Sequence, residues 1–288
     1  MKKGILTSIC VLLIFFTSGC LEKNSLDHAK IYTTVYPITY FTEVLYGNHS
    51  VISSIYPDGA NVLEYSLTDK QKKEYSKGDL FIYNGLSNEK QIAKDFSNSN
   101  RKLQIIDVAY GLKYKYGVEE LWLSPSNALM LASNIRMNLE SFIQNKFVNE
   151  EISNRYKDLE EILSLKDAEL RNIARTSATK KKNTIVVSSN VFKFLEDYGF
   201  TVISLEDNIE ENSFNILKKD FSSGTYKYLF VHEGLGNNDA VNELKNQGAT
   251  LFTVQTMTTL SAQNRKNNDN YMSIMQEFIE AIKEAVLN

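Results

Sequence analysis

The sequence has few cysteines and prolines and no excess of positive charge. It contains two cysteines and three prolines in 288 residues, and Cys10 lies in an apolar run near the start of the chain. If that run is removed as an export signal, one cysteine remains and no internal disulfide can form. The fold must then be stabilised by burial alone. The chain has 32 lysines and arginines against 35 aspartates and glutamates, so no basic field attracts nucleic acid and no such partner is expected.

The first 30 residues combine an apolar run with a cysteine that follows small side chains. Two lysines precede the run from Ile5 to Phe16, which is about half as long as a membrane-spanning helix. The sequence Thr17-Ser18-Gly19-Cys20 resembles a bacterial site of lipid attachment. We predict a signal peptide over residues 1–19, lipidation of Cys20, and a short polar tether over residues 20–30. This pattern favours an extracytoplasmic lipoprotein anchored to the bacterial cell membrane.

Short β-rich runs alternate with amphipathic stretches in both halves of the chain. Removal of 19 residues from 288 leaves about 269, a length that suits two modest domains better than one core. The alternation predicts an α/β fold of two similar lobes, each a mostly parallel sheet with flanking helices. The predicted strands are Ile31–Tyr36, Val51–Tyr56, Leu80–Tyr83, Leu103–Val108, Thr184–Val187, Thr201–Leu205, Tyr228–His232 and Thr250–Val254.

A single long helix is predicted between the two lobes. From Asn149 to about Ala178 the chain has no proline or glycine, and its apolar residues recur mostly every three or four positions. At about 1.5 Å per residue this helix would extend roughly 45 Å. Because no heptad repeat is sustained, we expect it to pack against its own lobes rather than in a coiled coil. The predicted domains are an N-terminal lobe over 31–148, the linking helix over 149–178 and a C-terminal lobe over 179–288.

Several motifs occur in the order that one known family uses. The similar segments are Thr33–Ile38, Tyr56–Tyr65, Lys77–Leu86 and Val118–Pro125. All three prolines of the chain, at positions 37, 57 and 125, fall where that family has a proline. The chain resembles the zinc- and manganese-binding lipoproteins, of the metal-binding adhesin type, that serve as substrate-binding proteins of ABC importers. The resemblance covers nearly all of the mature chain and implies metal-ion transport, with an ABC permease as the partner.

The resemblance also implies a metal site between the lobes, with one ligand from each of four loops. Leu63, Glu120, Ser189 and Thr258 occupy the positions of those ligands, where the family has histidine or a carboxylate. Ser188 takes the third position if the alignment gap is moved by one residue. Zinc and manganese sites need three or four imidazole, carboxylate or thiolate donors. Since only Glu120 is a plausible donor, we predict that zinc or manganese binds weakly or not at all.

The three histidines of the chain are the alternative source of ligands. His28 lies in the tether and His49 in a short turn, so both are expected to be exposed to solvent. His232 ends a predicted strand next to Glu233, and the ends of parallel strands face the cleft in open α/β sheets. A substitute site would combine His232 with Glu64, Glu120 or Glu233. The competing interpretation is a histidine that is hydrogen-bonded for structural reasons.

Two functions remain compatible with the sequence. One is a substrate-binding lipoprotein of a metal importer with an altered ligand set, and the other is a non-transport surface lipoprotein, an adhesin or accessory factor, that reuses the fold. No enzymatic activity is expected, because no Gly-x-Ser-x-Gly elbow or paired acid accompanies Ser188, Ser189 and His232. A monomer is expected. Aromatic residues beside the ligand positions indicate either a small organic solute or simple packing between the lobes.

Overall fold

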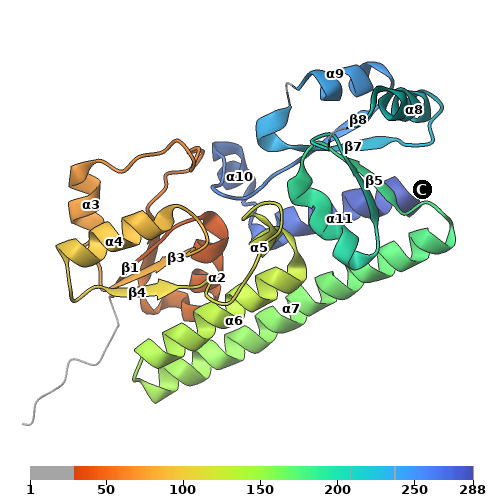
Figure 1. Ribbon diagram of the computed structural model, residues 1–288. Helices are drawn as coiled ribbons and strands as arrows, with labels where there is room; N and C mark the ends of the chain where they lie inside the picture. The colour runs from red at the N-terminus through yellow and green to blue at the C-terminus, as the bar shows by residue number, and fades with distance from the viewer. Residues whose placement is uncertain (1–28, 208, 237, 288) are drawn as a thin grey trace, which may run out of the picture.

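The computed structural model describes residues 29–207, 209–236 and 238–287. In it the chain forms two α/β lobes placed along one long helix (Figure 1). The predicted signal peptide, Cys20 and His28 lie outside the described residues. Within the described residues, no helix is long and apolar enough to cross a membrane. The predicted fold of two similar lobes joined by one long helix is confirmed.

The N-terminal lobe is built on a parallel sheet of four strands in the order β2-β1-β3-β4. The strands are β1 (Lys30–Thr33), β2 (Val51–Ser54), β3 (Leu80–Tyr83) and β4 (Gln104–Asp107). The helices of this lobe are α2 (Tyr36–Tyr46), the 3-10 turn η2 (Gly47–His49), α3 (Asp69–Tyr75) and α4 (Glu89–Ser99). Helix α2 packs on one side of the sheet and α4 on the other (Figure 1).

The C-terminal lobe repeats this arrangement with the strand order β6-β5-β7-β8. Its strands are β5 (Thr184–Val187), β6 (Thr201–Ser204), β7 (Tyr228–His232) and β8 (Thr250–Val254). Its helices are η3 (Asn190–Tyr198), α8 (Glu211–Ser222), η4 (Glu233–Leu235), α9 (Asp239–Asn246), α10 (Ala262–Asn267) and α11 (Tyr271–Leu287). In each lobe the first strand lies inside the sheet. All strand pairs are parallel, so the carboxyl ends of the strands in a lobe lie at the same end of its sheet.

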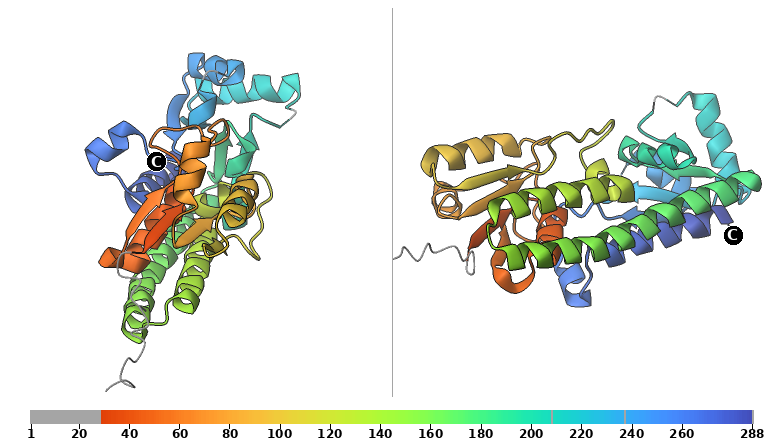
Figure 2. Two further views of the ribbon diagram at one scale, coloured as in Figure 1. Left: turned by 90° about the vertical axis from the view of Figure 1, so that its left-hand side faces the viewer. Right: turned by 90° about the horizontal axis from the view of Figure 1, so that it is seen from below.

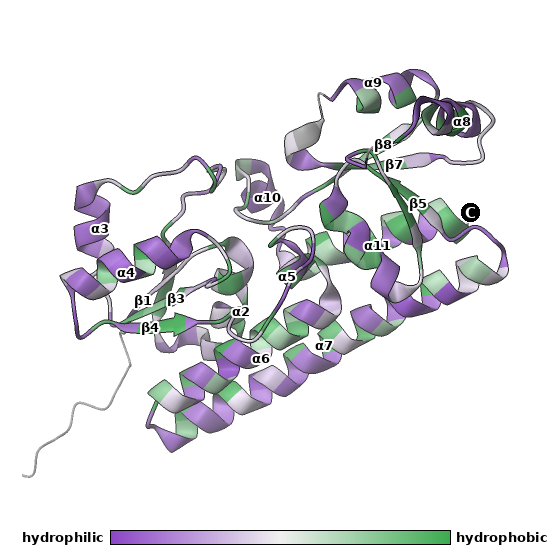
Figure 3. Ribbon diagram, viewed as in Figure 1, coloured by the Kyte–Doolittle hydropathy of each residue, from purple (hydrophilic) through white to green (hydrophobic). Residues whose placement is uncertain are grey.

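The long helix α7 spans Lys146–Thr179, slightly more than the predicted 149–178. It begins earlier because the side-chain oxygen of Asn145 accepts hydrogen bonds from the N–H groups of Phe147 and Val148. Helix α6 (Pro125–Phe142) lies beside it, preceded by the short α5 (Glu120–Leu123), and α7 continues beneath both lobes (Figure 2). Figure 3 shows apolar and polar residues mixed along α7, as expected for a helix with one buried stripe.

The first predicted strand is shorter than expected, and a helix follows it. We predicted a strand over Ile31–Tyr36, but β1 ends at Thr33 and α2 begins at Tyr36. Pro37 lies in the first turn of α2, where its fixed φ suits a helix and its missing N–H costs nothing. The β-branched and aromatic residues of this segment are buried in the helix, so their strand propensity was overridden by packing.

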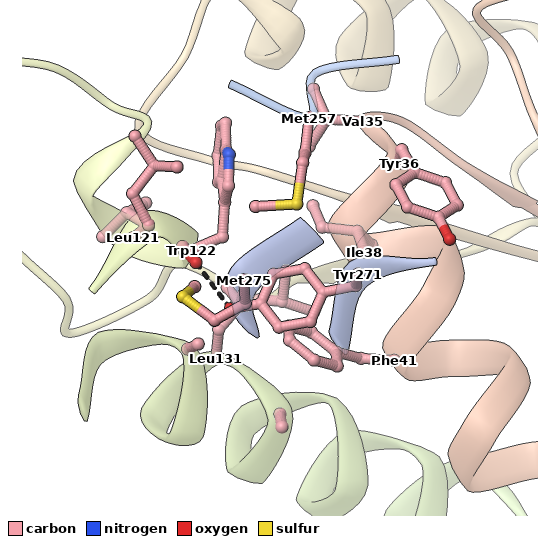
Figure 4. Close-up of a cluster of buried hydrophobic side chains, with 14 of the residues drawn as sticks. Val35, Tyr36, Ile38, Phe41, Leu121, Trp122, Leu131, Met257, Tyr271 and Met275 are labelled. Carbon is pink, nitrogen blue, oxygen red and sulfur yellow. Dashed lines mark hydrogen bonds between the residues drawn. The ribbon is translucent and has the colours of Figure 1, made fainter. Parts of the chain in front are cut away.

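The lobes share one hydrophobic core at their junction (Figure 4). Trp122 of α5, Phe41 of α2 and Tyr271 of α11 are completely buried in it. The indole N–H of Trp122 donates to the carbonyl oxygen of Thr256 at 2.6 Å. The hydroxyl of Tyr271 donates to the carbonyl oxygen of Trp122 at 2.5 Å. One tryptophan therefore connects the N-terminal lobe with two segments of the C-terminal part of the chain.

Candidate functional site

The first family loop is fixed at its start and exposed in its middle. Asp58 forms a two-point ion pair with Arg265 of α10, at 2.9 and 3.0 Å. The N–H of Gly59 donates to the carbonyl oxygen of Leu260 at 2.8 Å. Beyond these contacts the chain turns, and the Leu63 side chain at the first ligand position is 75% exposed. Glu64, a predicted alternative ligand, is also exposed.

Glu120, the one carboxylate at a family ligand position, accepts hydrogen bonds from the backbone of the preceding loop. Its side-chain oxygens accept hydrogen bonds from the N–H groups of Lys115, Tyr116 and Gly117, at 3.2, 2.5 and 2.9 Å. The residue is 5% exposed. A carboxylate that satisfies three backbone donors closes the loop before α5. A metal ion would have to compete with these three bonds.

Ser189 at the third position is paired with a carboxylate that the sequence analysis did not identify. Its hydroxyl donates to Glu206 at 3.0 Å, and the N–H of Asn190 donates to the same carboxylate oxygen at 2.6 Å. Glu206 follows β6, 17 residues further along the chain. The neighbouring Ser188 hydroxyl instead accepts the N–H of His232 at 2.8 Å. Glu206 thus brings a negative charge to the third position where the residue itself is neutral.

Thr258 at the fourth position belongs to a segment that crosses from the C-terminal sheet to the N-terminal lobe. Its carbonyl oxygen accepts the N–H of Tyr36 at 3.0 Å, and the Thr259 hydroxyl donates to the carbonyl oxygen of Ala60 at 3.2 Å. The preceding Met257 is buried and has a φ of 58°, in the left-handed region. The segment after β8 is therefore held as a bridge between the two lobes.

The alternative histidine ligands have other partners. The Nδ1 atom of His232 accepts the N–H of Gly234 at 3.1 Å, and Glu233 accepts the N–H of Thr256 at 2.9 Å. His49, which we expected to be exposed, is part-buried and lies 2.6 Å from Glu151 of α7. Among the described residues, no three histidine, cysteine, aspartate or glutamate side chains gather into a group that could hold a metal ion.

The aromatic residues beside the ligand positions belong to the core. Trp122 and Phe192 are completely buried. Tyr65 is part-buried, and its hydroxyl accepts a hydrogen bond from the side chain of Gln71 at 2.8 Å. These contacts favour packing between the lobes over an aromatic pocket for an organic solute.

Comparison with known proteins connects this geometry to a family. The family model described as zinc-uptake complex component A periplasmic, ZnuA, matches residues 31–285. The chain belongs to this family. The predicted resemblance to the substrate-binding proteins of metal ABC importers is confirmed.

Individual members of the ZnuA family are distant from this chain in sequence. The zinc-binding lipoprotein AdcA of Streptococcus pneumoniae R6 is 22% identical over 306 residues, which cover 97% of this chain and 60% of AdcA. The structure of its Zn(II)-bound ZnuA-like domain matches with a TM-score of 0.74 at 21% identity, over 91% of this chain and all of that domain. The metal-dependent lipoprotein YcdH from Bacillus subtilis matches with 0.75 at 20% identity, over 90% of this chain and all of YcdH. At these identities the structures establish the fold alone.

A buried carboxyl group lies beneath the first loop of this ZnuA-family chain. Glu89, at the start of α4, is 3% exposed, and it accepts the N–H of Asn84 at 2.9 Å. Burial raises the pKa of the Glu89 carboxyl from 4.5 to about 7, although its hydrogen bonds oppose the shift. Burial, together with the charge of Glu89, also raises the pKa of Tyr56, the first residue of the loop. The fold therefore favours the protonated form of Glu89.

We expect Glu89→Gln to flatten the dependence of stability on pH. Between pH 4.5 and about 7 the unfolded chain loses this proton while the folded chain keeps it. Ionisation therefore favours unfolding, and the contribution of Glu89 to stability falls as the pH rises through that window. Glutamine resembles the protonated acid and should be more stable than the parent above pH 7, by up to roughly 3 kcal/mol. Urea unfolding at a series of pH values measures the difference, and parallel curves for the two proteins would contradict it.

Proposed function

We propose that the chain is the lipid-anchored substrate-binding protein of a zinc- or manganese-type ABC importer, with weak affinity for its metal. The observation that carries this proposal is that the Glu120 carboxylate is already hydrogen-bonded to the protein backbone. It is the one carboxylate at the four family ligand positions, and its oxygens already accept three backbone N–H groups. A zinc or manganese site needs three or four good donors, and leucine, serine and threonine do not supply the others.

The family and the architecture support a transport role at the membrane surface. The family model covers residues 31–285, and each lobe has a four-stranded parallel sheet of the same strand order. The predicted partner is an ABC permease. We propose further that residues 1–19 are a signal peptide and that lipid at Cys20 anchors the protein outside the cytoplasm. The first strand, β1, begins at Lys30, ten residues after Cys20.

Thermal unfolding of the unmodified protein should be insensitive to micromolar zinc or manganese. A tightly bound ion at a hundred times its dissociation constant would stabilise the folded state by roughly 2.7 kcal/mol. A site whose one carboxylate already accepts three backbone N–H groups gives no such stabilisation at micromolar metal. Melting curves with and without each metal, after treatment with a chelator, measure the effect. A clear increase in melting temperature that Glu120→Ala or His232→Ala abolishes would show that the chain holds metal through that residue and would contradict the prediction of weak binding.

Replacement of Cys20 by serine should remove the anchor. At least two acyl chains are needed for stable attachment, and a single chain binds only marginally. The variant should appear in the medium or remain unprocessed, as measured by fractionation and intact mass. If Cys20→Ser stays in the membrane fraction with the mass of the mature parent, another segment holds the protein there.

A further inference from the structure

One end of the N-terminal lobe carries a concentration of positive charge that the metal-transport role does not use. We name this end the basal face and define it by five exposed residues, Lys30, Lys73, Lys77, Arg101 and Lys102. They come from three separate parts of the chain, namely the start of β1, the end of α3 with the turn after it, and the turn between α4 and β4.

Hydrogen bonds hold these three parts together at the amino ends of the strands. The N–H of Asp79 donates to the carbonyl oxygen of Lys30 at 2.9 Å, and the N–H of Gln104 donates to the carbonyl oxygen of Asp79 at 3.1 Å. The Asn100 side chain donates to the carbonyl oxygen of Ser76 at 2.8 Å. The five cations therefore lie together at the amino ends of the strands of the N-terminal sheet rather than on separate loops. Figure 1 shows this end of α3 and α4 remote from the C-terminal lobe.

The positive charge of the basal face is only partly compensated. Glu74 pairs with Lys77 at 3.3 Å, and Asp79 accepts the backbone N–H of Lys30 at 2.8 Å. Among the described residues, Lys77 alone of the five cations has a salt bridge. Five cations and two acids give the face a charge of +3. The chain without its first 19 residues has a net charge of −5, since two lysines are lost from a total of −3. The rest of the molecule is then −8, so the charge is strongly asymmetric.

The start of β1 lies within the basal face. Lys30, the first residue of β1, is ten residues from Cys20. A chain of that length reaches at most about 36 Å when fully extended. A lipid at Cys20 would therefore let the basal face reach the membrane surface, where anionic headgroups attract lysine and arginine over about 8–10 Å at physiological salt.

We propose that the basal face binds the anionic phospholipid headgroups of the membrane to which the chain is tethered. This proposal rests on the lipid anchor proposed above, which would bring the basal face to the membrane. An open groove of about 740 Å³ between the ends of α3 and α4 is lined by Lys72, Lys73 and Lys77 together with Asp69 and Asp95. Lys72 pairs with Asp95 at 3.1 Å, so Lys73 and Lys77 are the groove lysines that would meet headgroup phosphates. The molecule then stands on its N-terminal lobe, with the carboxyl ends of that sheet directed away from the lipid.

The test uses vesicles and a chain that carries no lipid. The protein from residue 20 onward, with Cys20→Ser, is mixed with phosphatidylcholine vesicles that contain about a third phosphatidylglycerol. Binding is measured by co-sedimentation. We expect binding to these vesicles, none to pure phosphatidylcholine, and loss of binding in about 1 M salt, where the screening length falls to about 3 Å.

A triple variant locates the contact. Each cation near an anionic surface contributes about fivefold to binding, so Lys77→Gln, Arg101→Gln and Lys102→Gln together should weaken it about a hundredfold. The matched control, Lys180→Gln, Lys181→Gln and Lys182→Gln, removes the same charge from the turn after α7 and should change binding less than about twofold. Far-UV circular dichroism and melting curves verify that both variants fold.

Any of three results would overturn the proposal. The parent protein does not bind anionic vesicles, or the basal-face variant binds as well as the parent, or the control variant loses binding. If the parent ignores vesicles but binds soluble polyphosphate through the same residues, the face serves a soluble polyanion and the membrane proposal is wrong. Because the chain used here has no lipid, these outcomes are independent of whether Cys20 is acylated and of whether metal binds.

Discussion

Replacement of Trp122 by alanine is expected to lower the free energy of unfolding by about 3–5 kcal/mol. The side chain is completely buried where α5, α11 and the segment after β8 meet. Alanine would leave a large cavity in the shared core and would strand the carbonyl oxygen of Thr256, which now accepts the indole N–H. For a domain whose total stability is about 5–15 kcal/mol, this loss is a large fraction.

Chemical denaturation followed by far-UV circular dichroism measures this loss, since removal of the one tryptophan of the chain also removes its fluorescence. Trp122→Phe is the matched control. It keeps most of the apolar volume and loses the indole N–H, so it should cost clearly less than alanine. A loss below about 1 kcal/mol for Trp122→Ala would mean that the junction contributes little to stability.

The second large effect is a gain of function. We expect the combined variant Leu63→His, Glu120→His, Ser189→Glu and Thr258→Asp to acquire a zinc-dependent melting temperature that the parent lacks. Four donors at the family ligand positions meet the requirement of a zinc site. At a hundred times the dissociation constant, zinc would stabilise the variant by roughly 2.7 kcal/mol. Without metal it should be less stable than the parent, because the carboxylate that holds the N–H groups of residues 115–117 is gone.

Two controls separate metal binding from the change in stability. Glu120→His alone should reproduce the loss of stability without zinc dependence, and the triple variant that retains Glu120 should respond to zinc more weakly than the full set. A quadruple variant that folds and ignores zinc would show that the four positions do not converge on one site. The proposed function would then need a different explanation for the altered residues.

The strands and the long helix could be predicted because their signals are local. The run Thr184–Val187 is β-branched throughout and flanked by polar residues, and the predicted strand agrees with β5. The stripe of apolar residues through α7 needs no knowledge of the partner surface. Helix α2 was missed because Val35, Tyr36 and Ile38 have strand propensity, and only the shared core gives them a helical environment.

The position of the candidate site rests on the family motifs, and the partners of its side chains could not be predicted from the sequence. The family motifs located Glu120 and Ser189, yet their partners depend on how loops fold back. The carboxylate of Glu120 meets N–H groups three to five residues earlier in the chain, and Ser189 meets a glutamate 17 residues later. No periodicity or spacing indicates such contacts, because irregular loops have no repeating geometry.

Tyr271 has a consequence for how the chain folds during synthesis. Its ring lies 4.7 Å from that of Phe41 in α2, although 230 residues separate them in the chain. The N-terminal lobe therefore cannot complete its interior until α11, the last helix, is available. Contacts between such distant residues form late, because a long loop must close before they give any stability. A chain still emerging from the ribosome would remain incompletely folded through most of its length, a state that would suit the export proposed above.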